Sequence, residues 1–267
     1  KGIDLPKELK ATTDIKAVLE FADVILLAIP SQTLRENLTS WKGFFPKDLP
    51  IISTLKGIEV ETQLRMTEVA QQVLEIDKSR LGIITGPNLA SEIIMRQPAG
   101  AVAASENPLN IAIMQELFST NYFRIYPSSD LIGCEFAGAA KSVIALAVGI
   151  AVGMGYGENT QGLMITRGLS EVARLGAAYG ANPLTFLGLA GIGDLVASAQ
   201  SPLSRNRSFG EVLGKSGSIT KARAQVVKTV EGVYSASAIL ELAHRVGIEV
   251  PIIEAVSDVV AGTLNPK

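Results

Sequence analysis

Two residues have sequence surroundings that suit proton transfer. Lys141 lies near the middle of the apolar segment Leu131–Gly157. Burial favours the neutral amine and lowers the pKa of a lysine, which would allow it to exchange a proton near neutral pH. Asp194 lies in a glycine-rich, apolar turn and could hold such an amine in place. Each also has an ordinary explanation, because a lysine amine can extend into solvent and an aspartate can cap a helix.

Other residues suit the binding of a phosphorylated ligand. Lys56 follows an apolar run and precedes a glycine, so its charge could hold a phosphate or polarise a carbonyl. Ser204, Arg205 and Asn206 combine a bidentate guanidinium with neutral hydrogen-bonding groups, although they could equally begin a solvated helix. Glu231 precedes an expected helix, where it could contact a ribose hydroxyl or an amide, or only complement the helix dipole.

The first half of the chain alternates expected strands with expected helices. The unbroken apolar run Val24–Ile29 predicts a strand buried on both faces, as in a parallel sheet. The further strands are expected at Ile51–Leu55, Leu81–Thr85, Ala99–Ala104 and Tyr122–Tyr126. Helical spacing of apolar residues is found in Ile15–Ala22, Met66–Ile76 and Leu109–Leu117. This order is typical of a doubly wound α/β layer.

Three loops follow expected strands, at the edge where open α/β sheets bind ligands. They are Ala28–Gln32, Ser53–Gly57 and Gly86–Ala90. The third is expected to open a helix whose free N–H groups suit an anion. Proline and glycine also end strands for structural reasons alone.

The second half of the chain has only helical patterns. Leu131–Gly153 is expected to be a long buried helix, and Gln161–Tyr179 another. Asn182 followed by proline has the pattern of a helix start, and further helices are expected after Ser204, Glu231 and Pro251. We therefore expect an α/β domain over residues 1–129 and an all-helical domain over residues 130–267.

Composition argues against several function classes. The net charge is -2 in 267 residues, which is unlike a nucleic-acid-binding protein. Cys134 is the only cysteine, so no intrachain disulfide can form, and a reducing compartment such as the cytoplasm is expected. His244 is the only histidine, which disfavours a metal site built on histidine and cysteine. The apolar segment is long enough to span a membrane, but Glu135, Lys141 and six glycines favour a buried core helix.

A dinucleotide-binding sheet normally opens with a strand, a Gly-x-Gly-x-x-Gly turn and a helix. The sequence contains no such turn. Either the first βαβ unit is missing from the sequence given, which we expect, or the protein does not bind a dinucleotide.

An ordered set of short motifs resembles the bacterial NAD(P)-dependent glycerol-3-phosphate dehydrogenases, over essentially the whole chain. The motifs are AIPSQ (28–32), STLKGIE (53–59), GPNLASE (86–92), AAKSVIA (139–145), ITRGLSE (165–171), GLAGIGDL (188–195), SRNRSFG (204–210), VEG (230–232) and VPIIEAV (250–256).

The resemblance implies a Rossmann-like N-terminal domain, here without its first βαβ unit, followed by an all-α C-terminal domain. It implies interconversion of dihydroxyacetone phosphate and sn-glycerol 3-phosphate with NAD or NADP, in the cytoplasm, by a homodimer that supplies phospholipid synthesis and needs no metal. The implied catalytic residues are Lys141, Lys56 and Asp194. The implied substrate contacts are Lys56, Gly86, Asn88, Lys141, Asp194, Ser204, Arg205 and Asn206, and the implied cofactor contacts are Ile29, Pro30, Lys56, Ala90, Arg205 and Glu231.

The sequence departs from the family pattern at Ser142, where many members have asparagine. We also expect that the sequence given stops before the family's last short helix. Two alternatives remain open at this point. One is a related dehydrogenase of the β-hydroxyacid or 6-phosphogluconate type, which shares the two-domain plan and a catalytic lysine. The other is a catalytically silent nucleotide-binding protein.

Overall fold

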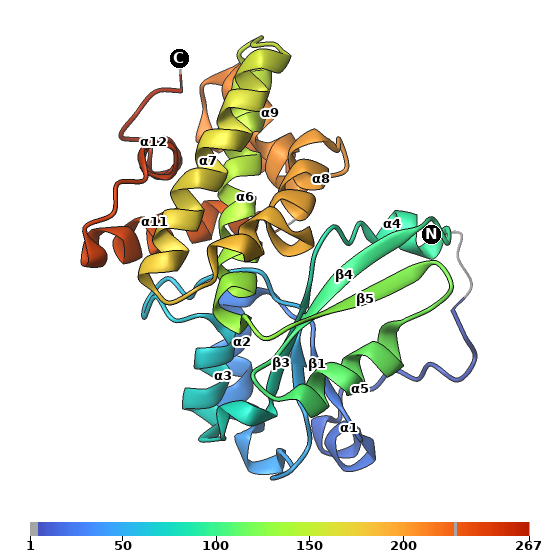
Figure 1. Ribbon diagram of the computed structural model, residues 1–267. Coiled ribbons are helices and arrows are strands. Elements are labelled where there is room, and N and C mark those ends of the chain that lie inside the picture. The colour runs from blue at the N-terminus through green and yellow to red at the C-terminus, as the bar shows by residue number, and fades with distance from the viewer. Residues whose placement is uncertain (1–4, 227–228, 267) are drawn as a thin grey trace.

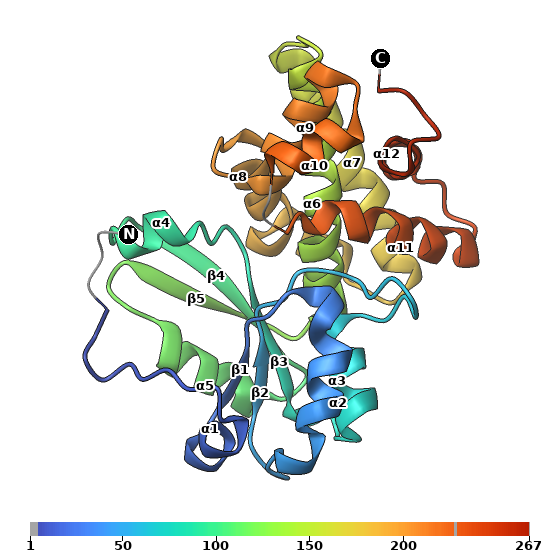
Figure 2. The same cartoon turned by 180° about the vertical axis from the view of Figure 1, so that it is seen from behind.

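The computed structural model describes residues 5–226 and 229–266. A five-stranded sheet with helices on both faces lies beside a group of helices (Figures 1 and 2). The strands are β1 (Ile25–Leu27), β2 (Ile51–Ser53), β3 (Leu81–Thr85), β4 (Ala99–Ala104) and β5 (Phe123–Ser128). The α-helices are α1 (Ile15–Phe21), α2 (Leu34–Trp41), α3 (Met66–Leu74), α4 (Ala90–Ile94), α5 (Pro108–Phe118), α6 (Leu131–Gly153), α7 (Glu158–Ala178), α8 (Asp194–Gln200), α9 (Arg205–Ser216), α10 (Ile219–Gln225), α11 (Glu231–Val246) and α12 (Pro251–Ala261). Short turns of other helix types are η1 (Ser31–Thr33), η2 (Lys42–Phe44), η3 (Lys78–Arg80), η4 (Pro183–Leu187) and the π-helical η5 (Leu189–Gly193).

The sheet has its strands in chain order, β1-β2-β3-β4-β5. β1, β2 and β3 are parallel, as expected, but β4 pairs with β3 in the antiparallel direction and β5 runs parallel to β4. A parallel return would need a crossover, normally through a full helix. The connection from β3 to β4 contains only the five-residue helix α4, and the chain reverses instead.

Helices cover the two faces of the sheet unequally. Side chains of α2 and α3, such as Leu38 and Val69, pack with Ile25 and Leu27 of β1 on one face. On the other face, α5 packs Met114 over the middle strands. β1 is an edge strand of the sheet, and its Leu26 is 45% exposed on the face away from α2. The prediction that this strand is buried on both faces was therefore wrong.

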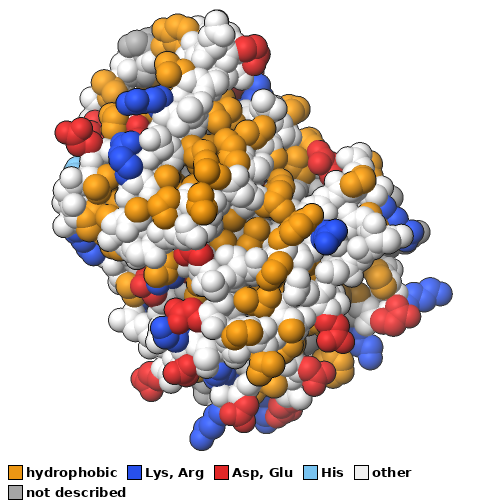
Figure 3. Space-filling model, in the orientation of Figure 1, with side chains coloured by type: hydrophobic (Ala, Val, Ile, Leu, Met, Phe, Trp, Pro, Cys, Tyr) orange, Lys and Arg blue, Asp and Glu red, His pale blue; other side chains and the backbone are white. Residues whose placement is uncertain are grey.

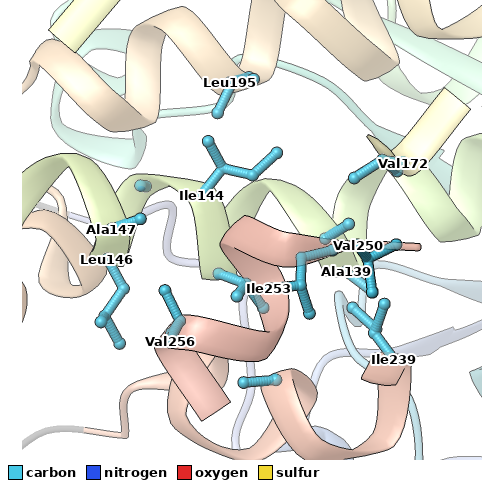
Figure 4. Packing of buried hydrophobic residues seen from close by; sticks show 14 of the residues in the cluster. Ala139, Ile144, Leu146, Ala147, Val172, Leu195, Ile239, Val250, Ile253 and Val256 are labelled. Atoms are coloured by element: carbon cyan, nitrogen blue, oxygen red, sulfur yellow. The ribbon is translucent and has the colours of Figure 1, made fainter. Parts of the chain in front are cut away.

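The helical part is built around α6, whose bounds match the predicted helix Leu131–Gly153. α7, α9 and α11 pack around it, and α12 adds Ile253 and Val256 to the same core (Figure 4). α6 is the one helix among the described residues that is long and apolar enough to cross a membrane, but 78% of its apolar window is buried inside the fold. Its apolar character is that of a core helix, as the charges within it predicted.

Helix starts were predicted more accurately than short helices. Ser204 caps α9, and Asn182 caps a turn, although that turn is the 3-10 helix η4 and not an α-helix. The helix expected at Gln161–Tyr179 begins earlier, at Glu158. The short helices α2, α8 and α10 were not predicted.

Charged side chains are spread over the surface. On the face shown in Figure 3, lysine and arginine side chains lie among aspartate and glutamate side chains, and no large area carries one sign.

Candidate active site

The carboxylate of Asp194 lies between the amines of Lys56 and Lys141. Lys56 Nζ donates to Asp194 Oδ2 at 2.6 Å, and Lys141 Nζ donates to Oδ1 at 2.8 Å. The aspartate side chain is 3% exposed and that of Lys141 12%, so the pair is largely shielded from water. Lys141 also donates to Ser198 Oγ at 2.7 Å, and Lys56 to the carbonyl of Gly86 at 2.9 Å. The structure thus brings together three residues predicted from the sequence.

The turn after β2 places Lys56 at the carboxyl edge of the sheet. The N–H and hydroxyl of Thr54 both donate to the carbonyl of Leu27, which ties this turn to the end of β1. The next residue, Gly57, packs so closely that a Cβ there would lie 2.6 Å from Ser31 Oγ. Glycine at this position allows the two loops to meet, and Lys56 is directed toward α6.

Asp194 is placed by the π-helical turn η5. A Cβ on Gly191 would lie 2.1 Å from the carbonyl oxygen of Phe186, so this compact turn requires glycine. Asp194 is the first residue of α8 and follows the N-cap Gly193, so the capping role considered from the sequence is not its role here. Its side chain bonds the two lysines instead.

The charges in this cluster shift each other's protonation. Burial lowers the pKa of Lys141 to about 8, and the positive charge of Lys56 acts in the same direction. The carboxylate of Asp194 opposes both effects. Burial alone would raise the pKa of Asp194, but the two ammonium groups outweigh it and hold that pKa below its usual range. The cluster therefore holds an amine that can exchange a proton near neutral pH beside a carboxylate that stays ionised.

A cavity of about 340 Å³ opens at the ends of β1 and β2 beside this cluster. Lys56 lines it, together with Arg205 and Glu231 from the helical part and Ile29 and Pro30 from the loop after β1. With Lys141 and Asp194 next to it, the region holds three cationic side chains against two carboxylates. This excess of positive charge suits an anionic ligand.

Comparison with protein-family models matches both parts of the chain. Residues 1–110 match the NAD-dependent glycerol-3-phosphate dehydrogenase N-terminus, and residues 130–267 match the C-terminus of the same family. The chain belongs to the NAD-dependent glycerol-3-phosphate dehydrogenase family.

Individual proteins similar to this chain are named glycerol-3-phosphate dehydrogenases. The chain is 48% identical over 259 residues to the glycerol-3-phosphate dehydrogenase [NAD(P)+] of Streptomyces avermitilis, covering 97% of this chain and 77% of the relative. It is 51% identical over 256 residues to that of Corynebacterium glutamicum, covering 96% and 77%. Among solved structures, glycerol-3-phosphate dehydrogenase from Coxiella burnetii superposes with a TM-score of 0.93 at 33% identity, covering 98% of this chain and 79% of the other. The enzyme from Saccharomyces cerevisiae gives 0.85 at 25% identity, covering 99% and 79%.

The family implies a nicotinamide dinucleotide, and part of the site fits one. Thr85 Oγ1 and Asn88 Oδ1 are buried at the end of β3 without a hydrogen-bond partner among the described residues. Buried polar atoms without a partner are uncommon in proteins, and a bound ligand is one explanation for them. The 340 Å³ cavity has room for one end of a dinucleotide, between apolar Ile29 and the charged groups of Lys56 and Glu231.

The remaining predicted residues lie around this site in different roles. Ser204 Oγ accepts from Arg207 N–H as the cap of α9, and Asn206 Oδ1 accepts from Gly232 N–H at 3.0 Å. Both are therefore engaged in packing the helices that carry Arg205 and Glu231. Ala90 begins the five-residue helix α4 and is exposed.

Two residues that support the site, Ser198 and Ser31, were not predicted from the sequence. Ser198 bonds both Lys141 and Asp194 and lies one helical turn after Asp194, so helical spacing could have identified it. Ser31 donates its hydroxyl and its N–H to the carboxylate of Glu231, although 200 residues separate them. No local pattern could have predicted that contact.

Proposed function

We propose that this protein interconverts dihydroxyacetone phosphate and sn-glycerol 3-phosphate with NAD or NADP. The observation that carries the proposal is the bridging of Lys56 and Lys141 by Asp194, beside a cavity with excess positive charge. Membership of the dehydrogenase family supports the same reaction.

Lys141 is the proposed proton donor and acceptor. In reduction, negative charge develops on the carbonyl oxygen at C2 of the substrate, and the ammonium of Lys141 donates a proton to it. In oxidation, the neutral amine accepts the proton from the hydroxyl. A nicotinamide held beside Lys56 and Glu231 would supply the hydride for reduction and accept it in oxidation. Asp194 orients the amine, and Lys56 adds positive charge near the developing alkoxide.

Arg205 is the proposed contact for the phosphate of the substrate and for the cofactor. Its guanidinium lines the cavity with Lys56, and its charge also contributes to lowering the pKa of Lys141, so it lies within electrostatic range of the amine. A guanidinium can bind phosphate through two hydrogen bonds. Gly86, Asn88, Ser204 and Asn206 complete the proposed substrate contacts.

The proposed cofactor contacts are Ile29, Pro30, Lys56, Ala90, Arg205 and Glu231. Ile29 and Pro30 offer an apolar wall, and Glu231, whose carboxylate accepts from Ser31, lines the same cavity. This placement suits the nicotinamide half of the dinucleotide.

Domain limits, assembly and cellular role extend the proposal. We place the boundary between residues 129 and 130, where the family's C-terminal region begins to match. We also propose a homodimer located in the cytoplasm, which supplies glycerol 3-phosphate for phospholipid synthesis. Sedimentation of the purified protein tests the dimer.

Substrate choice tests the proposed function. With NADH or NADPH, the protein is expected to reduce dihydroxyacetone phosphate and to leave unphosphorylated dihydroxyacetone largely unreacted. Oxidation of 3-hydroxy acids in place of glycerol 3-phosphate would instead indicate the β-hydroxyacid type of enzyme. No turnover of any of these would favour a silent nucleotide-binding protein.

The Arg205→Ala variant locates the phosphate contact. Its KM for dihydroxyacetone phosphate should rise at least tenfold, because a charge-assisted hydrogen bond contributes about 1.5–3 kcal/mol. Arg167→Ala, an exposed arginine on α7, is the control and should keep the KM of the unmodified protein. An unchanged KM in Arg205→Ala would remove Arg205 from the phosphate site.

A further inference from the structure

A second buried carboxylate connects the two parts of the fold. Glu135 on α6 is 6% exposed, and it accepts from the N–H of Thr67 at 2.9 Å and from the Thr67 hydroxyl at 2.7 Å. It also forms an ion pair with Arg65. Both partners lie at the start of α3, which packs on the sheet. Neither the proton transfer nor the phosphate contact described above uses this cluster.

Arg65, one partner of Glu135, is linked to the segment that directly follows Lys56. Arg65 forms an antiparallel bridge with Ile58, two residues after Lys56. Within the same turn, Glu59 N–H donates to the carbonyl of Leu64 at 3.0 Å. Residues 58–65 are therefore a closed turn whose two ends are held together, and Glu135 holds that turn at Arg65.

Glu135 and Lys141 both lie on α6. Glu135 lies six residues before Lys141, about 9 Å along the helix axis. Between them, a Cβ on Gly138 would lie 3.2 Å from Thr85 Oγ1 and 3.5 Å from Lys56 Cγ, so α6 packs closely against the end of β3 and the side chain of Lys56. A small shift of α6 against these residues would therefore change the separation of the two lysine amines.

Net stability is a weak explanation for this ion pair. Desolvation of two buried charges offsets much of their attraction, so such pairs contribute more to geometry than to free energy in some proteins. Glu135 accepts at an N-terminal N–H of α3, where a carboxylate is directed to one fixed position. This favours a role in fixing the position of α6 relative to α3.

We propose that Glu135 is a positioning residue that fixes Lys141 of α6 relative to Lys56 through Arg65 and Thr67. The proposal rests on the proposed function, because it concerns the geometry of the same proton-transfer cluster. A misplacement of about 1 Å can cost roughly a hundredfold in rate. Loss of this anchor should therefore reduce kcat more than it affects KM.

The test compares Glu135→Gln with a matched control, Glu171→Gln. Glu171 is also a buried carboxylate on a helix, and it accepts from the N–H groups of Ile252 and Ile253 at the start of α12, which belongs to the helical core. Both substitutions keep side-chain volume and remove one buried charge at a helix start. Both should lower thermal stability, but only Glu135→Gln should lower kcat, by about ten- to a hundredfold, with KM for dihydroxyacetone phosphate within about twofold of the unmodified protein.

Hydrogen exchange supplies a readout that does not depend on turnover. Amides of residues 58–67 should exchange faster in Glu135→Gln than in Glu171→Gln. Equal kcat values in the two folded variants, or unchanged exchange over residues 58–67, would overturn the positioning role. If the unmodified protein does not reduce dihydroxyacetone phosphate, the proposed function fails instead, and the exchange measurement still decides whether Glu135 holds the turn.

Discussion

At Lys141, burial and a neighbouring positive charge act together on one amine. They lower its pKa to about 8, while Asp194 keeps it from losing its proton fully at neutral pH. A proton donor whose pKa lies near the working pH is both populated and reactive, which is what carbonyl reduction requires. The amide of asparagine at position 194 would keep the shape of this contact but not its charge.

The pH dependence of reduction follows from this shift. A lysine is protonated below its pKa, so kcat/KM for dihydroxyacetone phosphate should be level below about pH 8 and fall above it. Lys56→Met removes a charge that lowers the pKa of Lys141, so the fall in the residual activity should move to higher pH. Steady-state rates from pH 6 to 10 measure both the level part of the profile and the fall above it.

The control for this experiment is Lys78→Met, a largely exposed lysine that pairs with Glu106 and does not line the 340 Å³ cavity. Its pH profile should match that of the unmodified protein. If Lys56→Met leaves the fall at the same pH as the control, then Lys56 does not set the protonation of Lys141.

Residue types revealed much of this chemistry before the fold was known. A lysine in an apolar helix and an aspartate in a glycine-rich turn were informative because both are costly to bury without a partner. Ser31 gave no such signal, and Glu135, a charge in the same apolar segment as Lys141, gave no indication of its partners. Their partners are 200 residues away in one case and about 70 in the other, and only folding brings them together.

At the scale of elements, close packing of α6 against α9 supports the whole helical part. Gly149 and Gly153 of α6 and Gly210 and Gly214 of α9 allow backbone contact between the two helices. A Cβ on Gly210 would lie 2.1 Å from the carbonyl oxygen of Leu146. Because Arg205 begins α9 and Lys141 lies on α6, this packing also fixes the helix that carries Arg205 relative to the helix that carries Lys141.

Gly210→Ala should therefore destabilise the protein by about 1–3 kcal/mol, since the added methyl forces the helices apart. Urea unfolding followed by circular dichroism measures the change. Gly162→Ala is the matched control: this glycine lies on an exposed part of α7 with open space around its Cβ position. It should stabilise by about 0.5–1 kcal/mol, because alanine is the better helix former. Equal effects of the two substitutions would contradict close α6–α9 packing.

Elements with strong patterns were predicted well, and the others were not. α6 was predicted with its observed bounds because a predominantly apolar stretch of its length has few other solutions. The antiparallel direction of β4 was not visible, because strand direction depends on the path of the connection and not on the strand's own residues. The π-helical turn before Asp194 was missed for the same kind of reason, since its shape depends on contact with Phe186.

At the scale of the whole molecule, the candidate site is made where the sheet meets the helical part. Lys56 lies at the carboxyl edge of the sheet, while Lys141 lies on α6 and Asp194 on α8. The bonded pair Lys56 and Asp194 is separated by 138 residues of sequence. The sequence predicted an α/β part followed by a helical part, and it singled out Lys56, Lys141 and Asp194, which the structure brings together. The contacts across the two parts, through Asp194, Glu231 and Glu135, required the structure.

The most direct test of the account is chemical rescue of Lys141→Ala. Loss of a positioned proton donor typically costs about a hundredfold to ten-thousandfold in rate, so kcat for reduction of dihydroxyacetone phosphate should fall by that factor while circular dichroism stays unchanged. Added methylammonium should restore part of the activity in proportion to its concentration, because the shortened side chain leaves room for a small amine beside Asp194. Near-normal turnover by Lys141→Ala without added amine would contradict the account.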